Sequence, residues 1–373
     1  MREPSPAPPY GARKIAVVVS GWPRLSESFA VNELLALESA GMLAGIFATK
    51  CGDIAQQHPA IAGLTTPVHY LPVGSVDVQA GALVDVLADV QAVGVHGYFA
   101  HQPADVACRA AARLGVPFGF SAHAKDPRKV APEELVRRSR AAACIIACNA
   151  DVAGQLRDVG ATPVLVPHGV DLAAFSPAAP RSGKRLELLA VGRLVAKKGF
   201  DVLIDAVGRL DVDLRLRIVG DGPLRAHLTG LATSGSAASG SGDGGRVEFV
   251  GTRTHAELPS LYRSSDIVVV PSVVDVTGDR DGLPNVVLEA MASGLAVIGS
   301  DVAALPTAID HGATGLLVDP GDAAALAEAI SLLACDDQRR RAMGAAGRLR
   351  AEAHFGLPAC TNRFLTILEA AYG

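Results

Sequence analysis

Two cations follow a predicted strand end in the segment Val191–Gly199, which reads VGRLVAKKG. Gly192 frees the turn after the strand, and Arg193 and Lys198 come next. Ligands of open α/β sheets bind outside the carboxyl ends of the strands. Because a guanidinium forks onto phosphate oxygens and an ammonium adds a point charge, this pair suits a diphosphate. A solvated basic turn is the alternative, and the segment alone does not decide between them.

A second stretch, Asp279–Gly294, has the features of a phosphate-binding helix start and reads DRDGLPNVVLEAMASG. Gly282 and Pro284 predict a tight turn with Pro284 in the first position of a helix, and Gly294 predicts where that helix ends. A helix N-terminus presents amide groups and a partial positive charge to an anion. The residues that we predict to bind the donor are Gly192, Gly282, Leu283, Pro284, Asn285, Val286 and Glu289 in these two segments, together with Gly220, which follows another strand.

Two carboxylates accompany this helix start. Glu289 lies one turn beyond Asn285 on the same face, where a carboxylate can accept hydrogen bonds from both hydroxyls of a ribose. Asp281 precedes the helix, where it can hold sugar hydroxyls. Both acids could instead be solvated surface charges, but the apolar neighbours of Glu289 argue against that alternative for this residue.

The segment Val219–Pro223, VGDGP, is a weaker signal. Glycines after a strand, such as Gly220, allow close approach of the backbone to a ligand. Arg225 occupies the last glycine position of a dinucleotide-binding pattern, so an ordinary strand-to-helix turn is the alternative here.

The first half of the chain offers histidines and one loop. His123 follows a predicted strand and is a candidate for contacting a transferred sugar, as is His168, although a lone histidine is more often structural. The segment Gly21–Ser28 follows the first strand and lacks the dinucleotide glycine pattern, which weakens an NAD(P) interpretation. Within it we predict Gly21, Ser26 and Glu27 to shape the acceptor side.

The elements that position these residues alternate from residue 14 onward. Apolar runs predict strands at Lys14–Ser20, Gly45–Thr49, Val93–Tyr98, Pro117–Ser121, Cys144–Cys148, Leu186–Gly192, Leu214–Val219, Val247–Val250, Ile267–Val270, Ala296–Ser300 and Gly315–Val318. Helical patterns such as Ser28–Ala40 lie between several of them, which predicts parallel sheets covered on both faces. The Gly/Ser-rich segment Thr229–Gly245 is predicted to be a surface loop.

A Pro/Gly/Ala-rich stretch, Pro163–Gly183, interrupts this alternation and marks a domain boundary. The fold class we predict is α/β with two Rossmann-like domains. The first covers residues 1–172 and the second residues 173–356, and a last helix covers residues 357–373.

The composition of the chain limits the classes of protein to which it can belong. The chain has 373 residues, of which 49% are hydrophobic and 19% charged, which suits two well-buried domains. A formal net charge of -4 gives no general attraction to nucleic acid or membranes. None of the 6 cysteines forms a C-x-x-C pair, so reduced thiols are expected. Met1–Tyr10 resembles a disordered lead rather than a signal peptide. We therefore expect a cytoplasmic protein, with peripheral membrane attachment left open.

No His, Cys, Asp or Glu cluster has a familiar metal-ligand spacing. The nearest candidate, Asp279-Arg-Asp281, precedes a predicted phosphate-binding helix, where the helix and nearby cations already supply positive charge. We therefore predict no metal and no other cofactor.

Taken together, the motifs resemble glycosyltransferase family 4. The matching segments are VGRLVAKKG, VGDGP, ELPSLYRSSDIVVVPS, DGLPNVVLEAMASG and HGVDLAAFSP. The resemblance implies a GT-B fold with a central cleft, and retaining, metal-independent transfer from a nucleotide-sugar to a glycan, lipid-linked or small-molecule acceptor. It implies catalytic roles for Arg193, Lys198, His123 and Asp281, and a final helix, 357–373, that crosses back to the first domain.

The opening PRLSESFAVNELLALE narrows the resemblance to transferases that build bacterial exopolysaccharides such as colanic acid. One position departs from the family, whose E-x7-E motif begins with Glu where this chain has Asp281. The acid is kept but is shorter by one methylene, so its contact with the donor sugar is the carry-over that this substitution affects.

Three other functions stay open. One is a GT-B enzyme of another kind, such as a nucleotide-sugar epimerase or a phosphorylase. Another is a nucleotide-sugar-binding protein without catalysis. The third is a dehydrogenase built on two Rossmann domains, against which the missing glycine pattern argues.

Overall fold

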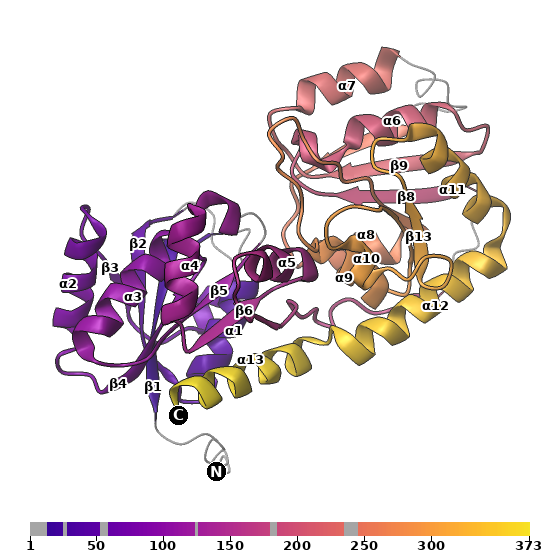
Figure 1. Cartoon of the computed structure of the whole chain (residues 1–373). Coiled ribbons are helices and arrows are strands. Elements are labelled where there is room, and N and C mark those ends of the chain that lie inside the picture. Colours follow the sequence, from indigo (N-terminus) through magenta and orange to yellow (C-terminus); the bar gives the residue numbers. More distant parts are fainter. Residues whose placement is uncertain (1–12, 25–27, 53–58, 124–125, 180–184, 235–244) are drawn as a thin grey trace, which may run out of the picture. The chain divides into compact units, whose positions relative to one another are not determined.

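The computed structural model describes residues 13–373 except 25–27, 53–58, 124–125, 180–184 and 235–244. Two compact units make up the chain (Figure 1). Unit 1 comprises Met1–His168 and Pro358–Gly373, and unit 2 comprises Gly169–Leu357. The division after His168 and the predicted boundary after residue 172 both fall in the stretch Pro163–Gly183.

Unit 1 contains a parallel sheet in the order β3-β2-β1-β4-β5-β6-β7. Its strands are β1 (Lys14–Trp22), β2 (Leu43–Cys51), β3 (Val68–Tyr70), β4 (Ala92–Tyr98), β5 (Phe118–Ala122), β6 (Cys144–Ala147) and β7 (Val164–Leu165). Its helices are α1 (Ser28–Ser39), α2 (Val76–Leu87), α3 (Gln102–Leu114), α4 (Pro132–Ala141), α5 (Ala150–Asp158) and α13 (Leu357–Tyr372), with short 3-10 turns η1 (Pro59–Gly63) and η2 (Pro127–Lys129).

Both faces of this sheet are covered. Leu83 of α2 and Ala107 of α3 pack on one face, and Leu34 of α1 and Leu368 of α13 pack on the other. Every residue of β1 after Lys14 is buried, which is why its sequence is a continuous apolar run rather than an alternating one.

A buried polar chain fixes α13 to the sheet. The Tyr372 hydroxyl lies 2.9 Å from Nδ1 of His96 in β4, and Nε2 of that histidine lies 2.9 Å from the Ser121 hydroxyl in β5. Gly94 and Gly119 leave room for the tyrosine ring, because a Cβ at either position would lie within 2.5 Å of Tyr372 atoms.

Unit 2 contains a second parallel sheet in the order β10-β9-β8-β11-β12-β13. Its strands are β8 (Leu186–Val191), β9 (Leu214–Val219), β10 (Val247–Gly251), β11 (Ile267–Val270), β12 (Ala296–Ser300) and β13 (Gly315–Val318). Its helices are α6 (Phe200–Gly208), α7 (Arg225–Ser234), α8 (Leu258–Arg263), α9 (Asn285–Ala292), α10 (Leu305–Ala308), α11 (Ala323–Cys335) and α12 (Asp337–His354), with one short turn, η3 (Ala196–Lys198).

The strand order in both units is that of a doubly wound Rossmann-like sheet. The order reverses between β1 and β4 in unit 1 and between β8 and β11 in unit 2. Such a reversal opens a crevice at the carboxyl ends of the two strands, where ligands of this fold bind. The candidate site is therefore expected at the ends of these strands.

The structure differs from the predicted elements in several places. Residues 229–234, predicted as loop, continue helix α7, whereas 235–244 lie outside the described residues. The short strands β3 and β7 were not predicted. Pro284 is the N-cap of α9 rather than its first helical residue, since its ψ of 135° is extended.

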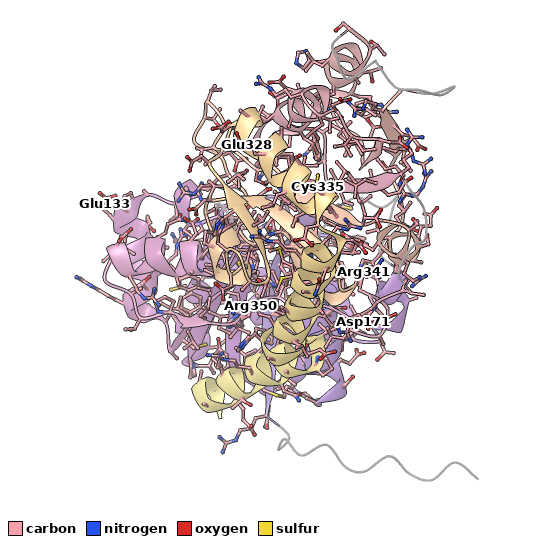
Figure 2. The ribbon with its side chains drawn as sticks, turned by 90° about the vertical axis from the view of Figure 1, so that its right-hand side faces the viewer. Glu133, Asp171, Glu328, Cys335, Arg341 and Arg350 are labelled. Atoms are coloured by element: carbon pink, nitrogen blue, oxygen red, sulfur yellow. The ribbon has the colours of Figure 1, made fainter. Side chains whose placement is uncertain are left out.

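In unit 2, helix α11 ends at Cys335 and helix α12 begins at Asp337. Figure 2 labels this cysteine together with Arg341 and Arg350 on α12. The Cys335 thiol is exposed, and the described cysteines form no disulfide. Within the described parts of the chain, no helix is both long enough and apolar enough to cross a bilayer.

The contact between α12 and α9 depends on a glycine. A Cβ on Gly344 of α12 would lie 2.2 Å from the carbonyl oxygen of Gly294, which ends α9. We expect Gly344→Ala to lower the free energy of unfolding of unit 2 by about 1–3 kcal/mol, the usual cost of overpacking.

Gly230 in α7 is the matched control, because a Cβ there would meet nothing within 4 Å. Gly230→Ala should be neutral or stabilise by up to about 1 kcal/mol, since alanine favours helix more than glycine does. Denaturant unfolding of both variants measures the difference. Equal effects of the two substitutions would contradict close packing at Gly344.

Candidate active site

Glycines bring the loops after three strands of unit 2 into contact. A Cβ on Gly220, after β9, would lie 2.0 Å from the carbonyl oxygen of Gly192, after β8. A Cβ on Gly199 would likewise lie 2.0 Å from the carbonyl oxygen of Pro271, after β11. Gly220 and Gly199 also have positive φ angles of 132° and 61°. Backbone packing at these positions therefore excludes any side chain.

Lys198 and Asp281 meet where the strand order reverses. The Lys198 ammonium donates to an Oδ of Asp281 at 2.7 Å, and the Ser272 hydroxyl donates to the same oxygen at 2.8 Å. Asp281 is 7% exposed, so its charge depends on these partners. Two predicted site residues thus form one ion pair after β8 and β11.

Lys197 extends this cluster and was not among the predicted site residues. Its ammonium lies 3.4 Å from an Asp279 carboxylate oxygen and 3.5 Å from Asp281. Its carbonyl accepts a hydrogen bond from the Val273 amide at 2.9 Å. The sequence VAKKG contained this lysine, but nothing in the sequence distinguished its role from that of an ordinary surface cation.

The first turn of α9 follows directly after Asp281. Its N-cap residue, Pro284, has no side-chain capping hydrogen bond and supplies no donor of its own. The predicted donor-binding residues Gly282, Leu283, Asn285 and Val286 are partly exposed around it. Amide groups at such a helix start are available to an anion.

Gly294 ends the same helix as predicted. Its φ is 71°, its amide bonds to the Met291 carbonyl at 3.0 Å, and the Leu295 amide bonds to the Ala290 carbonyl at 3.0 Å. This pair of hydrogen bonds is a Schellman motif, which satisfies the carbonyls at the helix end.

Glu289 of α9 is buried and has a specific partner. The Tyr262 hydroxyl donates to one carboxylate oxygen at 2.7 Å, and His255 Nε2 lies 3.9 Å from the other. Burial raises the pKa of the Glu289 carboxyl to about 7, and the Tyr262 hydrogen bond opposes this shift. Tyr262 is fully buried and was not predicted as a site residue, although the motif ELPSLYRSSD contains it.

The side chain of Arg193 is exposed, whereas those of Lys197 and Lys198 are only partly exposed. Two backbone hydrogen bonds hold the turn that contains Arg193. The Leu194 amide donates to the Asp221 carbonyl at 3.0 Å, and the Val195 amide donates to the Arg193 carbonyl at 2.8 Å. The guanidinium is thus placed on a fixed backbone and open to solvent.

His123 is the one predicted catalytic residue in unit 1. It follows β5 and is 6% exposed. Asp126 fixes the backbone around it by accepting from the His123 amide at 3.2 Å and from the Ala100 amide, after β4, at 2.9 Å. Burial raises the Asp126 pKa to about 7. Nε2 of His123 is buried without a hydrogen-bond partner among the described residues.

His168 lies against His123. Nδ1 of His123 and Nε2 of His168 are 3.4 Å apart, and Phe29 stacks on His168 at 4.1 Å between ring centroids. Burial, followed by the nearby His168, lowers the pKa of His123 well below its usual value, so His123 is neutral. Contacts with Cys148 and Glu33 outweigh burial and raise the pKa of His168 to about 9.

Of the predicted acceptor-side residues, Gly21 lies inside β1 rather than in the following loop, and it is buried. Ser26 and Glu27 lie outside the described residues. The remaining predicted site residues, His123 and His168 apart, all belong to unit 2.

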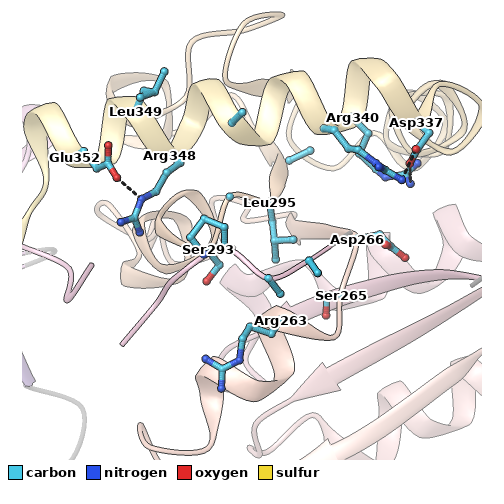
Figure 3. A pocket seen from close by; sticks show the side chains of 17 residues that line it. Arg263, Ser265, Asp266, Ser293, Leu295, Asp337, Arg340, Arg348, Leu349 and Glu352 are labelled. Carbon is cyan, nitrogen blue, oxygen red and sulfur yellow. Dashed lines mark hydrogen bonds and ion pairs between the residues drawn. The ribbon is translucent and has the colours of Figure 1, made fainter. Parts of the chain in front are cut away.

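Unit 2 also has a cavity of about 480 Å³ whose lining includes none of the predicted site residues. Figure 3 shows the side chains that line it. It is lined by Asp266 and Ala296, at the amino ends of β11 and β12, and by side chains of α12. Arg348 in its wall is paired with Glu352 at 2.6 Å, and Arg340 is paired with Asp337. The cavity therefore lies at the edge of the sheet opposite the candidate site, and these cations are already neutralised.

Comparisons with known proteins agree with the two-unit division of the chain. Residues 27–174 match the model "Glycosyltransferase Family 4", and residues 185–336 match "Glycosyl transferases group 1". The chain belongs to glycosyltransferase family 4, and its fold is GT-B.

Two curated relatives illustrate the range of the family. A putative colanic acid biosynthesis glycosyltransferase, WcaL, of Salmonella typhimurium is 31% identical over 182 residues, which are 47% of this chain and 43% of that protein. A GDP-mannose-dependent phosphatidylinositol monomannoside mannosyltransferase of Corynebacterium glutamicum is 34% identical over 220 residues, 55% of each chain. The matched part thus spans about half the length of these relatives.

A solved structure covers more of the chain. HepE of Anabaena, in complex with UDP, has a TM-score of 0.78 at 18% identity and covers 96% of this chain and 100% of its own. This likeness establishes the fold.

The raised pKa of Glu289 predicts a pH-dependent stability. An ordinary glutamate titrates near 4.5, so the stability linked to the buried, protonated carboxyl is complete below that value and is lost as pH rises through about 7. We expect unit 2 to lose on the order of a few kcal/mol between roughly pH 5 and pH 8. Thermal unfolding should show Glu289→Gln to be less dependent on pH than the unchanged chain. Identical pH profiles would refute the shift.

Proposed function

We propose that the protein is a retaining glycosyltransferase that moves a sugar from a nucleotide-diphosphate-sugar to an acceptor in bacterial polysaccharide or glycolipid synthesis. The observation that carries the proposal is the Lys198–Asp281 ion pair beside the uncapped start of α9, at the point where the strand order of unit 2 reverses. A diphosphate carries the charge that such a site attracts.

In this proposal the diphosphate is the leaving group. Negative charge grows on it as the acceptor hydroxyl attacks the anomeric carbon and the bond to the phosphate oxygen breaks. Cations and amides fixed before the reaction stabilise that charge without reorganisation. Arg193, Lys198 and the first amides of α9 fill this role, and the departing phosphate oxygen accepts the acceptor's proton, so no separate protein base is needed.

Asp281 has two successive roles in this proposal. In the described structure its carboxylate neutralises Lys198, at 2.7 Å, so an arriving phosphate competes with it for the ammonium. Once the phosphate holds Lys198, Asp281 can accept hydrogen bonds from the donor sugar. The Ser272 hydroxyl, at 2.8 Å, keeps the carboxylate in place during this exchange.

For unit 1 we propose that His123 contacts the transferred sugar. Its Nε2, buried and without a partner among the described residues, needs a hydrogen bond that a sugar hydroxyl would supply. The protein is proposed to work in the cytoplasm without a metal or other cofactor, with peripheral membrane attachment when its acceptor is lipid-linked.

An assay of donor turnover with and without acceptor tests the proposal. UDP- and GDP-sugars are the first donors to try, because HepE was crystallised with UDP and the Corynebacterium relative is GDP-mannose-dependent. Transfer that requires an acceptor and keeps the anomeric configuration supports it. Turnover of the donor alone to an epimer would favour an epimerase, whereas binding without turnover by any acceptor would favour a non-catalytic binding protein.

Arg193 and Lys198 should matter for the chemical step. We expect Arg193→Ala or Lys198→Ala to lower turnover by roughly 10²–10³-fold, as the loss of a transition-state donor does. Arg209→Ala is the matched control, because this exposed arginine of unit 2 pairs with Asp205 of its own helix region at 2.9 Å. Steady-state kinetics on folded variants measures the effect. Activity within a few-fold of the control would make both residues ordinary surface cations.

Metal removal gives a second test. Since helix amides and cations supply the positive charge in this proposal, we expect activity to survive EDTA. Loss of activity with EDTA that Mg²⁺ or Mn²⁺ restores would overturn the metal-free mechanism. Asp279 and Asp281 would then be the candidate ligands.

Glu289 is proposed to accept hydrogen bonds from the ribose of the donor. A hydrogen bond to a charged group contributes about 1.5–3 kcal/mol, so Glu289→Gln should weaken donor binding by about one to two orders of magnitude while the fold persists. Calorimetry with the nucleotide-sugar measures the affinity, and circular dichroism checks folding.

The variant Tyr262→Phe distinguishes a ribose-binding role of Glu289 from a purely structural one. It removes the hydroxyl that donates to Glu289 at 2.7 Å but leaves the carboxylate in place. If Glu289 binds ribose, this variant keeps most of the affinity that Glu289→Gln loses. If both variants lose stability and keep affinity, Glu289 is a structural carboxylate whose role is to pair with Tyr262.

A further inference from the structure

Three potential metal ligands lie close together in unit 1, although they do not belong to one short sequence motif. His123, Cys148 and His168 each offer one ligand atom, and these atoms all lie within 4.8 Å of one another. His123 and Cys148 are buried, and His168 is largely so. They follow β5, β6 and β7, which are neighbours in the sheet, so parallel pairing brings them to one edge.

The separation of the two histidines suits a tetrahedral ion. Nδ1 of His123 and Nε2 of His168 are 3.4 Å apart, and their rings are inclined by only 14°. Two nitrogens bound to a tetrahedral zinc lie about 3.3–3.4 Å apart, given Zn–N bonds of about 2.0–2.1 Å. With the thiol within 4.8 Å of both nitrogens, closing the site needs side-chain shifts on the order of 1 Å.

The surroundings also resemble those of a metal site. The free ring nitrogen of His168, Nδ1, faces a Glu33 carboxylate oxygen at 3.7 Å, and the Tyr98 hydroxyl donates to the other oxygen. A carboxylate behind a histidine orients that ligand in many metal sites. Asn149 donates to the Cys148 sulfur at 3.1 Å, which holds the sulfur in place.

The cluster is enclosed by protein. Glu33, which faces Nδ1 of His168, is only 8% exposed. Phe29, stacked on His168, keeps this side of the cluster apolar.

We propose that His123, Cys148 and His168 form a binding site for a single zinc-class divalent cation, with the protons of the Cys148 thiol and of His168 released to solvent on binding. Histidine and thiolate ligands favour zinc over magnesium or calcium. A fourth position is left for water or for another oxygen ligand. The site is separate from the diphosphate cluster of unit 2. It uses Nδ1 of His123 and leaves Nε2, the nitrogen proposed to contact the sugar, so it does not depend on the proposed function.

Cobalt(II) is the probe, because a thiolate bound to it absorbs by charge transfer. The full-length chain, freed of metal by a chelator and kept reduced, is titrated with Co²⁺ and then with Zn²⁺. We expect one equivalent of Co²⁺ to give the thiolate band and one equivalent of Zn²⁺ to abolish it. Calorimetry with Zn²⁺ alone gives the affinity.

Cys148→Ser should remove the thiolate band and weaken zinc binding by roughly 10–100-fold or more. Cys144→Ser is the matched control, since this thiol lies at the start of β6, the strand that Cys148 follows, but contacts the Tyr372 hydroxyl at 3.9 Å instead. His168→Gln provides a second ligand variant should Cys148→Ser fail to fold, and it should weaken zinc binding to a similar extent.

The opposite results overturn the proposal. They are the absence of a thiolate band, a band that survives Cys148→Ser, or a band that Cys144→Ser removes equally. In each of these cases the cluster is a hydrogen-bonded histidine pair next to Glu33. Because the readout is metal binding, failure here leaves the proposed transfer reaction unaffected.

Discussion

Parallel strand pairing is the constraint on which the rest of this structure depends. It brings the carboxyl ends of every strand in a sheet to one edge, so residues far apart in sequence meet there. Lys198 and Asp281 are separated by 83 positions, yet β8 and β11 are adjacent and their following loops share an ion pair. The glycines at 192, 199 and 220 allow these loops to approach until their backbones touch. The opposite edge of the unit 2 sheet holds the cavity of about 480 Å³ and none of the predicted site residues.

Much of the fold could be predicted because buried parallel strands are continuous apolar runs. Lys14–Ser20, Leu214–Val219 and Ile267–Val270 all lie in observed strands. The strands β3 and β7 could not be predicted, since 3 and 2 residues carry too little periodicity and owe their conformation to a neighbouring strand. Composition misled the prediction at residues 229–234, where Gly, Ser and Thr suggested a loop. Packing of Leu228 and Ala232 on the core keeps α7 helical there.

The candidate site likewise has features that could be predicted from the sequence and features that could not. A helix start, its closing glycine and a glutamate one turn in are local features, which spacing along one segment can reveal. The partners Tyr262 and Ser272 are tertiary contacts, and no spacing rule indicates which hydroxyl will reach which carboxylate. The histidine pair of unit 1 is a stronger case, because its members are 45 positions apart. A search for short ligand motifs cannot detect ligands that come from the ends of neighbouring strands.

The helix α13 has a consequence for how the chain acquires its structure during synthesis. Unit 2 is one continuous segment, Gly169–Leu357, whereas unit 1 needs residues from both sides of it. The two connections lie together, since the Leu357 amide bonds to the Val170 carbonyl at 2.9 Å. A ribosome releases residues in order, so unit 2 has its whole sequence available before unit 1 does. Until α13 emerges, His96 lacks its contacts with Tyr372 and Phe364, and the domain that begins first is completed last.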